Sequence, residues 1–147
     1  MQTAETLAIL AAGGFFLVGL LTGVWKYQQI HGREDAEAHP YVNIAHRTAL
    51  LYAFACLLLA QFARLSVLSD LVNTIAVAVQ VVFFAAAVLS YVVHGWLADT
   101  DNQLRKPHQL GKSRVPGGVV ALFMWALIAG EIGGFVVLFY GVIQGVL

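Results

Sequence analysis

The sequence predicts an all-α integral membrane protein in which four helices form an antiparallel, up-and-down bundle. Hydrophobic residues make up 60% of the 147 residues and charged residues only 11%, against roughly 45–50% and about 25% in soluble domains. The apolar residues form continuous runs without strand-like alternation, which favours helices in lipid. Short membrane helices need their neighbours to complete a bundle, so residues 1–147 are expected to form a single transmembrane domain.

Each of the four apolar runs reaches the roughly 20 residues that a helix needs to cross the hydrocarbon core of a bilayer. A tight turn over residues 64–70 joins the second run to the third. Two longer polar loops, residues 26–43 and 98–116, follow the first and the third runs. The expected spans are therefore about residues 7–25, 44–63, 71–97 and 117–147.

The distribution of basic residues predicts the orientation in the membrane. Seven of the eight Lys and Arg residues lie in or beside the two long loops, and only Arg64 lies at the opposite rim. Loops rich in Lys and Arg stay in the cytoplasm, so we expect a multi-pass protein of the bacterial inner membrane with both termini outside. The lipid bilayer is an expected partner, with the basic loops touching anionic headgroups, and nothing in the sequence implies nucleic acid.

This threading brings all five histidines to the cytoplasmic rim. His46 and His94 lie just inside the second and third spans, at about the depth of Thr22 in the first. Imidazole is a good ligand for heme iron, so His46 and His94 are candidates for cofactor binding. Thr22 is a third candidate, because a planar cofactor between the helices would meet its hydroxyl group in the same layer. The alternative is that both histidines are interfacial residues bonded to water or headgroups. The remaining loop residues are expected to be solvated and not to bind a cation, namely His31, His39, His108 and the stretch Asp99–Asn102.

Glu131 is expected near mid-membrane, at about the depth of Gln61 and Gln80. An ionised carboxylate is costly there, so Glu131 should be protonated, paired or turned toward a wet cavity. It serves either as helix glue, hydrogen-bonded to one of the two glutamines, or as a group that handles protons or orients a substrate. Tyr52 and Tyr91, a turn or two inside the histidine layer, complete the set of candidate catalytic residues.

Small residues recur every fourth position in the first and fourth spans, as Gly19-x-x-x-Gly23 and Ala126-x-x-x-Gly130-x-x-x-Gly134. Such faces let helices approach closely. They indicate either packing within one bundle or an interface between subunits.

The stretch Gly19-Leu20-Leu21-Thr22-Gly23, followed by a polar loop and by Ala45-His46 at the head of a Leu/Ala-rich helix, resembles a known family. The family comprises small four-helix membrane proteins that include hydroxylaminobenzene mutases and styrene oxide isomerases, and the likeness covers roughly the first third of the chain. It implies an oligomeric bundle, trimeric in the isomerases, that holds heme b through one histidine, here His46. Six residues further on the chain has Tyr52, in a region where the family carries Asn-Gly.

The favoured function is that of a heme b-dependent isomerase or mutase, in which the iron rearranges a small apolar substrate as a Lewis acid without net redox change. Tyr52, Tyr91 or Glu131 would orient the substrate or move a proton. If His46 and His94 both bound the iron, the protein would instead be an electron-transfer subunit. A third alternative is a metal-free structural or accessory subunit. The sequence leaves open the substrate and the number of subunits.

Overall fold

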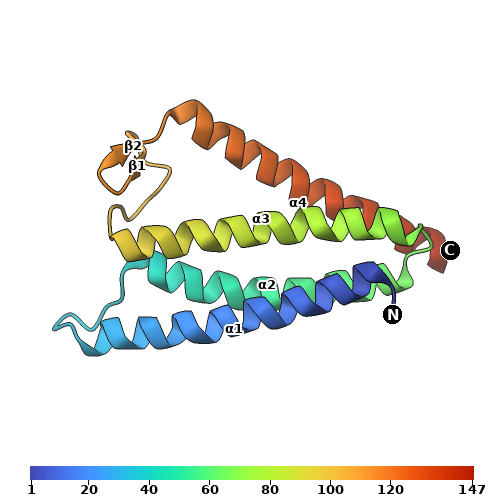
Figure 1. Cartoon of the computed structure of the whole chain (residues 1–147), viewed down its shortest axis with the longest axis horizontal. Coiled ribbons are helices and arrows are strands. Elements are labelled where there is room, and N and C mark those ends of the chain that lie inside the picture. The colour runs from blue at the N-terminus through green and yellow to red at the C-terminus, as the bar shows by residue number, and fades with distance from the viewer.

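The computed structural model describes all 147 residues and consists of four long helices. Successive helices run in opposite directions, so that both termini lie at one end and the two long loops at the other (Figure 1). A short β-hairpin in the second long loop is the only other regular element. The elements are α1 (Thr3–His31), α2 (Pro40–Leu65), α3 (Asp70–Leu97), β1 (Gln109–Leu110), β2 (Ser113–Arg114) and α4 (Gly117–Val146).

All four predicted helices are confirmed, and each is long and apolar enough to cross a membrane. The first three extend beyond the predicted spans, most of all at the end of α1, which continues past Trp25 to His31. His31 therefore ends a helix instead of lying in a loop. The extra turns contain Lys26 and two glutamines, which are good helix formers although they are polar, so hydropathy marks the apolar span but not the end of the helix.

The tight turn between α2 and α3, together with the first residue of α3, is hydrogen-bonded to both α1 and α4 at the end that carries the termini. The carboxylate of Asp70 accepts hydrogen bonds from the backbone N–H groups of Thr3 (3.1 Å) and Ala4 (3.2 Å) at the start of α1. A carboxylate suits this position because it satisfies free N–H groups at the positive end of a helix. In the same turn the N–H of Val67 donates to the carbonyl of Gly141 (3.2 Å), which fixes α4.

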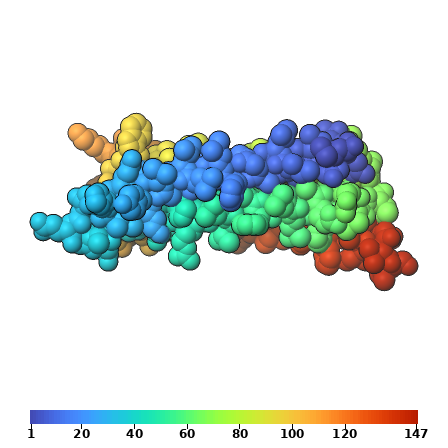
Figure 2. All heavy atoms as spheres, turned by 90° about the horizontal axis from the view of Figure 1, so that it is seen from below, coloured from blue at the N-terminus to red at the C-terminus, as the bar shows by residue number.

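The first three helices share a core that is built largely from alanine. Figure 2 shows α1 and α2 side by side along one face of the molecule. Larger side chains enter the core near its middle, where the ring of Tyr52 stacks on that of Phe84 with centroids 4.0 Å apart. Phe15 meets both rings edge-on. The alanines of this core cluster are Ala4, Ala8, Ala12, Ala49, Ala53, Ala60, Ala63 and Ala76.

The glycines of both small-residue faces make contacts inside the chain. A Cβ added to Gly19 would lie 2.5 Å from the Leu50 side chain, and one added to Gly134 would lie 2.7 Å from the Ala76 carbonyl oxygen. Gly23 and Gly130 are equally crowded, by His46 and Phe83. Of the two alternatives for these glycines, the structure therefore supports packing within one bundle.

The fourth helix is the least enclosed. Its only buried residues are Leu138 and Gly141, close to its C-terminal end. Toward its N-terminal end α4 diverges from α3, and the β-hairpin loop lies across the mouth of the resulting wedge (Figure 1). This divergence makes room for the cavity described below.

Candidate functional site

Two separate groups of polar side chains lie at the loop end of the bundle. The first is on the seam between α1 and α2. Nδ1 of His46 lies 2.7 Å from the carbonyl oxygen of Gly19, and because a carbonyl only accepts, this nitrogen carries the ring proton. The ring also lies against Gly23, where an added Cβ would come within 2.8 Å of the His46 Cε1.

This arrangement fits a histidine that ligates heme iron. Fixing the proton on Nδ1 leaves the lone pair on Nε2, and ligating histidines usually donate their other N–H to a carbonyl or carboxylate in this way. The glycine face provides a cradle that any side chain at position 23 would fill. His46 is half-buried, and none of the three principal cavities is lined by it.

Thr22 lies on the same seam but has already used its hydroxyl. The buried Oγ1 donates within its own helix, 2.7 Å from the carbonyl oxygen of Val18 and 3.0 Å from that of Gly19. It therefore supports the carbonyl to which His46 donates. A direct contact between the Thr22 hydroxyl and a cofactor would require these bonds to break.

The second group lies beneath the loop between α3 and α4 and is organised by His94. Nδ1 of His94 lies 2.8 Å from Oδ1 of Asp99, and the two side chains are only 8% and 4% exposed. The other carboxylate oxygen accepts the N–H of Gly111 in the β-hairpin turn. Burial disfavours the charged form of Asp99, but the hydrogen bonds from His94 and Gly111 outweigh it, so the pKa of Asp99 lies below its usual value.

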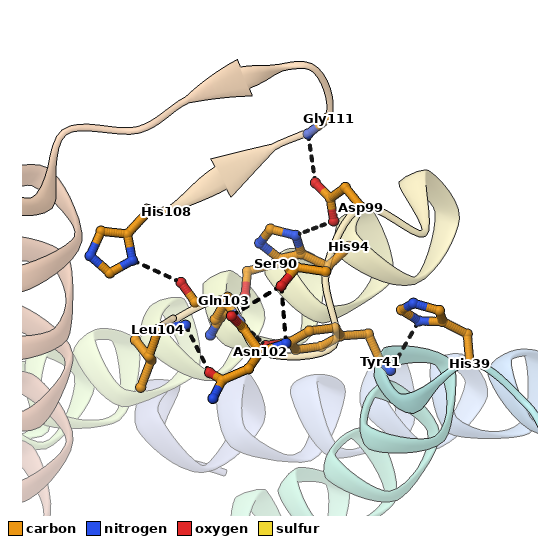
Figure 3. Close-up of polar contacts among 11 residues, drawn as sticks. His39, Tyr41, Ser90, His94, Asp99, Asn102, Gln103, Leu104, His108 and Gly111 are labelled. Carbon is orange, nitrogen blue, oxygen red and sulfur yellow. Dashed lines mark hydrogen bonds and ion pairs between the residues drawn. The ribbon is translucent and has the colours of Figure 1, made fainter. Parts of the chain in front are cut away.

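Gln103 connects this pair to the rest of the loop (Figure 3). Its side-chain oxygen accepts the Ser90 hydroxyl (3.1 Å), and its backbone N–H donates to the hydroxyl of Tyr41. Its carbonyl oxygen lies 3.1 Å from Nδ1 of His108. The buried Tyr41 ring in turn packs on His94, with centroids 5.2 Å apart. Loop and helices thus form one hydrogen-bonded unit.

A cavity of about 410 Å³ lies between α3, α4 and this loop. Its polar lining consists of Ser90, His94, Gln103, His108 and Gln109. Most of the other lining side chains are apolar, and no Lys, Arg, Asp or Glu is among them. Mostly apolar pockets with a few convergent polar groups are typical of small-molecule sites.

The three candidate catalytic residues interact electrostatically and so lie near one another, but no hydrogen bond joins any two of them. Tyr52 belongs to the aromatic core of the first three helices. Tyr91 stacks on Tyr41, with ring centroids 5.9 Å apart. Glu131 lies on α4, and its Oε1 is buried without a hydrogen-bond partner.

Neither of the two glutamines expected to pair with Glu131 does so. Gln61 is exposed, and the amide of Gln80 donates instead to the carbonyl of Ala76 in its own helix (3.1 Å). The carboxyl group of Glu131 is therefore not hydrogen-bonded helix glue within a single chain, which leaves its role in proton handling or substrate orientation as the open alternative.

His46 and His94 have separate sets of partners. His46 is bound to α1, whereas His94 is bound to the loop that precedes α4 and packs on Tyr41. The chain gathers no group of three or more His, Cys, Asp or Glu side chains that could hold a metal ion. An iron atom held by this chain would therefore have at most one or two protein ligands, and the porphyrin of a heme would have to supply most of the others.

From the sequence, Asp99 and His108 were expected in a solvated loop, and Gln103 was not recognised as a site residue. The structure brings them against α3 because Ala98 adopts a left-handed conformation (φ 47°) and turns the chain back over the helix end. The one sequence feature that pointed to this pairing was a histidine in the last turn of α3, His94, followed by an acidic residue just beyond the helix, Asp99. Nothing in the local sequence predicted that the loop would fold inward.

Comparisons of the chain with protein-family models, with curated proteins and with solved structures gave no match.

Proposed function

We propose that this chain is a multi-pass membrane protein that binds heme b through Nε2 of His46 and rearranges a small apolar substrate, as an isomerase or a mutase. The observation that carries the proposal is the geometry of His46. Its Nδ1 proton is held by the Gly19 carbonyl, its ring lies on Gly23, and no protein group is hydrogen-bonded to its Nε2. The likeness of residues 19–23 and 45–46 to the heme-dependent isomerases points the same way.

A single histidine ligand is favoured over a pair. His94 is held by Asp99 and by the ring of Tyr41, on the side of the bundle where the loop packs. Swinging it to His46 would leave the buried Asp99 carboxylate without its histidine partner and with only the N–H of Gly111, which is costly. With His46 alone the iron keeps a position open for substrate, and this supports rearrangement over electron transfer.

When bound, heme iron supplies Lewis acidity at its open position. The chain contributes the imidazole and its fixed orientation, and Thr22 supports the carbonyl that sets this orientation. Among the three candidate catalytic residues, Glu131 has the carboxyl group that suits proton transfer, because its Oε1 is buried and has no partner, and it lies on α4 and not on the α1–α2 seam that holds His46. Tyr52 and Tyr91 already fill aromatic stacks, which suits them to shaping an apolar site.

The position of His46 on a half-buried seam also supports a homo-oligomer, with a trimer as the form that the resemblance implies. An exposed porphyrin on this seam would be covered either by lipid or by a second copy of the chain. The surrounding helices expose many large apolar side chains, which suits either neighbour and lets an apolar substrate enter from the bilayer. The inner bacterial membrane, with the basic loops in the cytoplasm, remains the proposed location.

The visible spectrum of the purified protein, as isolated and after addition of hemin and of reductant, tests this proposal. We expect a Soret band that is lost in His46→Ala and kept in His94→Ala. Loss or a change of ligation in both variants would instead favour the electron-transfer alternative. Absence of any Soret band in the folded protein, even with added hemin, would sink the heme proposal and favour an accessory subunit.

A further inference from the structure

The cavity between α3 and α4 is independent of the His46 seam and has an unusual polar end. Two imidazoles reach it, one from α3 and one from the loop, and each has one nitrogen already bound. Nδ1 of His94 donates to Asp99 and Nδ1 of His108 donates to the Gln103 carbonyl. In the neutral rings, these bonds leave the Nε2 atoms of both as acceptors.

The orientation of His94 is fixed from two sides. The Asp99 carboxylate, itself anchored by Gly111, holds the Nδ1 edge, and the ring of Tyr41 packs on its face. Figure 3 shows the other ring nitrogen of His94 pointing away from Asp99, toward the side on which His108 and α4 lie. A carboxylate that orients a histidine in this way is a recurrent device for presenting the far nitrogen to a ligand or substrate.

The rest of the cavity selects against charge. Its walls are formed mainly by aliphatic side chains of α3 and α4, with Phe123 and Met124. No Lys, Arg, Asp or Glu side chain lines it. The hydroxyl of Ser90 is already donated to Gln103. The ligand that these walls fit is therefore a largely apolar molecule that brings one hydrogen-bond donor to the histidine end.

We propose that this cavity is a binding site for a small apolar alcohol or phenol, whose hydroxyl group donates a hydrogen bond to Nε2 of His94. Asp99 is a positioning residue, since it acts through His94. The divergence of α4 from α3 places the site between two membrane-spanning helices, where such a molecule can arrive from the lipid (Figure 1). This proposal does not rest on heme at His46.

The test uses a matched pair of probes, 4-(trifluoromethyl)phenol and its methyl ether, with the protein in lipid nanodiscs. Fluorine NMR measures the saturable bound fraction after subtraction of partitioning into empty nanodiscs. We expect the phenol to bind about tenfold more tightly than the ether, the ratio that corresponds to one hydrogen bond of about 1.4 kcal/mol. His94→Gln and Asp99→Asn should each reduce this preference, whereas His31→Gln, at an exposed histidine, should leave it unchanged.

A variant that fills the cavity tests the site without changing its polar residues, so the result does not depend on whether the polar variants fold. Ala86→Phe, on the α3 wall, should abolish saturable binding of both probes while leaving the His94–Asp99 pair in place. Equal affinity for phenol and ether, or phenol binding that persists in folded His94→Gln, would overturn the proposal. Saturable binding that survives Ala86→Phe would place the probe elsewhere and overturn it as well.

Discussion

His46 and His94 each have one ring nitrogen bound by the chain, but the atoms that bind them differ in kind. His46 donates to a neutral backbone carbonyl on α1, whereas His94 donates to a carboxylate in a loop. The first contact depends on how closely two helices approach, and the second depends on the fold of residues 98–111. Single substitutions can therefore perturb one histidine without touching the other.

Gly23→Ala tests the close approach at His46. The added methyl group would lie 2.8 Å from the His46 Cε1, so the ring must move and lose its bond to Gly19. We expect a loss of about 1–3 kcal/mol in the free energy of unfolding, typical of overpacking, and weaker hemin binding. Unfolding in denaturing detergent and hemin titration measure the two effects. Gly13→Ala is the control, because nothing lies within 4 Å of its added Cβ, and equal losses in both variants would contradict the prediction.

Asp99 makes the loop fold dependent on pH. Its pKa in the folded chain lies below the ordinary value of 3.8, so its ionised form stabilises the fold. That contribution is complete above the unfolded value and is lost as the pH falls through the lowered folded value. Protection of the Gly111 amide against hydrogen exchange should therefore decline in acid below about pH 4. In Asp99→Asn protection should be weaker and should vary less over this range, and a decline identical to that of the wild type would exclude Asp99 as its cause.

At the scale of the elements, α4 differs from the other three helices. The carboxyl-terminal half of α4 is held at glycines that face α3 and the α2–α3 turn, whereas its amino-terminal half diverges and leaves the cavity. Close packing at one end and divergence at the other are thus parts of the same geometry. The glycines set how near α4 can approach α3, and so set the shape of the wedge.

Gly134→Ala is expected to move α4. Its added Cβ would lie 2.7 Å from the backbone carbonyl oxygen of Ala76, which cannot rotate away as a flexible side chain can. We expect a loss of about 1–3 kcal/mol in the free energy of unfolding. Gly133→Ala, one residue earlier and with nothing within 4 Å, should change stability little. Detergent-induced unfolding compares the two, and a greater loss in Gly133→Ala would mean that the α3–α4 contact is misassigned.

At the scale of the whole molecule, charge is distributed unevenly between the two ends. The end with the long loops carries seven of the eight Lys and Arg residues, and the end with both termini has only Arg64. In a membrane this asymmetry should hold the histidine-bearing loops in the cytoplasm. The His46 seam and the α3–α4 cavity would then both open near the cytoplasmic face.

Cysteine labelling tests this orientation. The only native cysteine, Cys56, is buried, so it can be replaced by serine to give a background without thiols. In intact spheroplasts an impermeant maleimide should label Val67→Cys in the short turn and leave Lys112→Cys in the long loop unlabelled. Both positions are exposed in the structure. In inverted vesicles the pattern should reverse, and the opposite pattern in both preparations would invert the proposed topology.

Much of the fold follows from the sequence, because span length and apolar continuity are one-dimensional properties. The four helices, their alternation and the collection of histidines at one end were all predictable from runs of about 20 apolar residues. Polar helix ends were not, as the extension of α1 to His31 shows. The glycine face of α1 and His46 were each identified from the sequence, but the contact between them was not predicted.

Only the tertiary structure decided which polar atoms meet. The pairing of His94 with Asp99 depends on a left-handed residue, Ala98, that turns the loop back over α3, and local sequence does not dictate such a turn. The unpartnered Oε1 of Glu131 and the divergence of α4 depend likewise on how far two helices approach. The sequence by itself determined the helices and the end at which the histidines gather. Contacts between distant segments determined which side chains form a site, because packing depends on distances in space that periodicity along the chain does not encode.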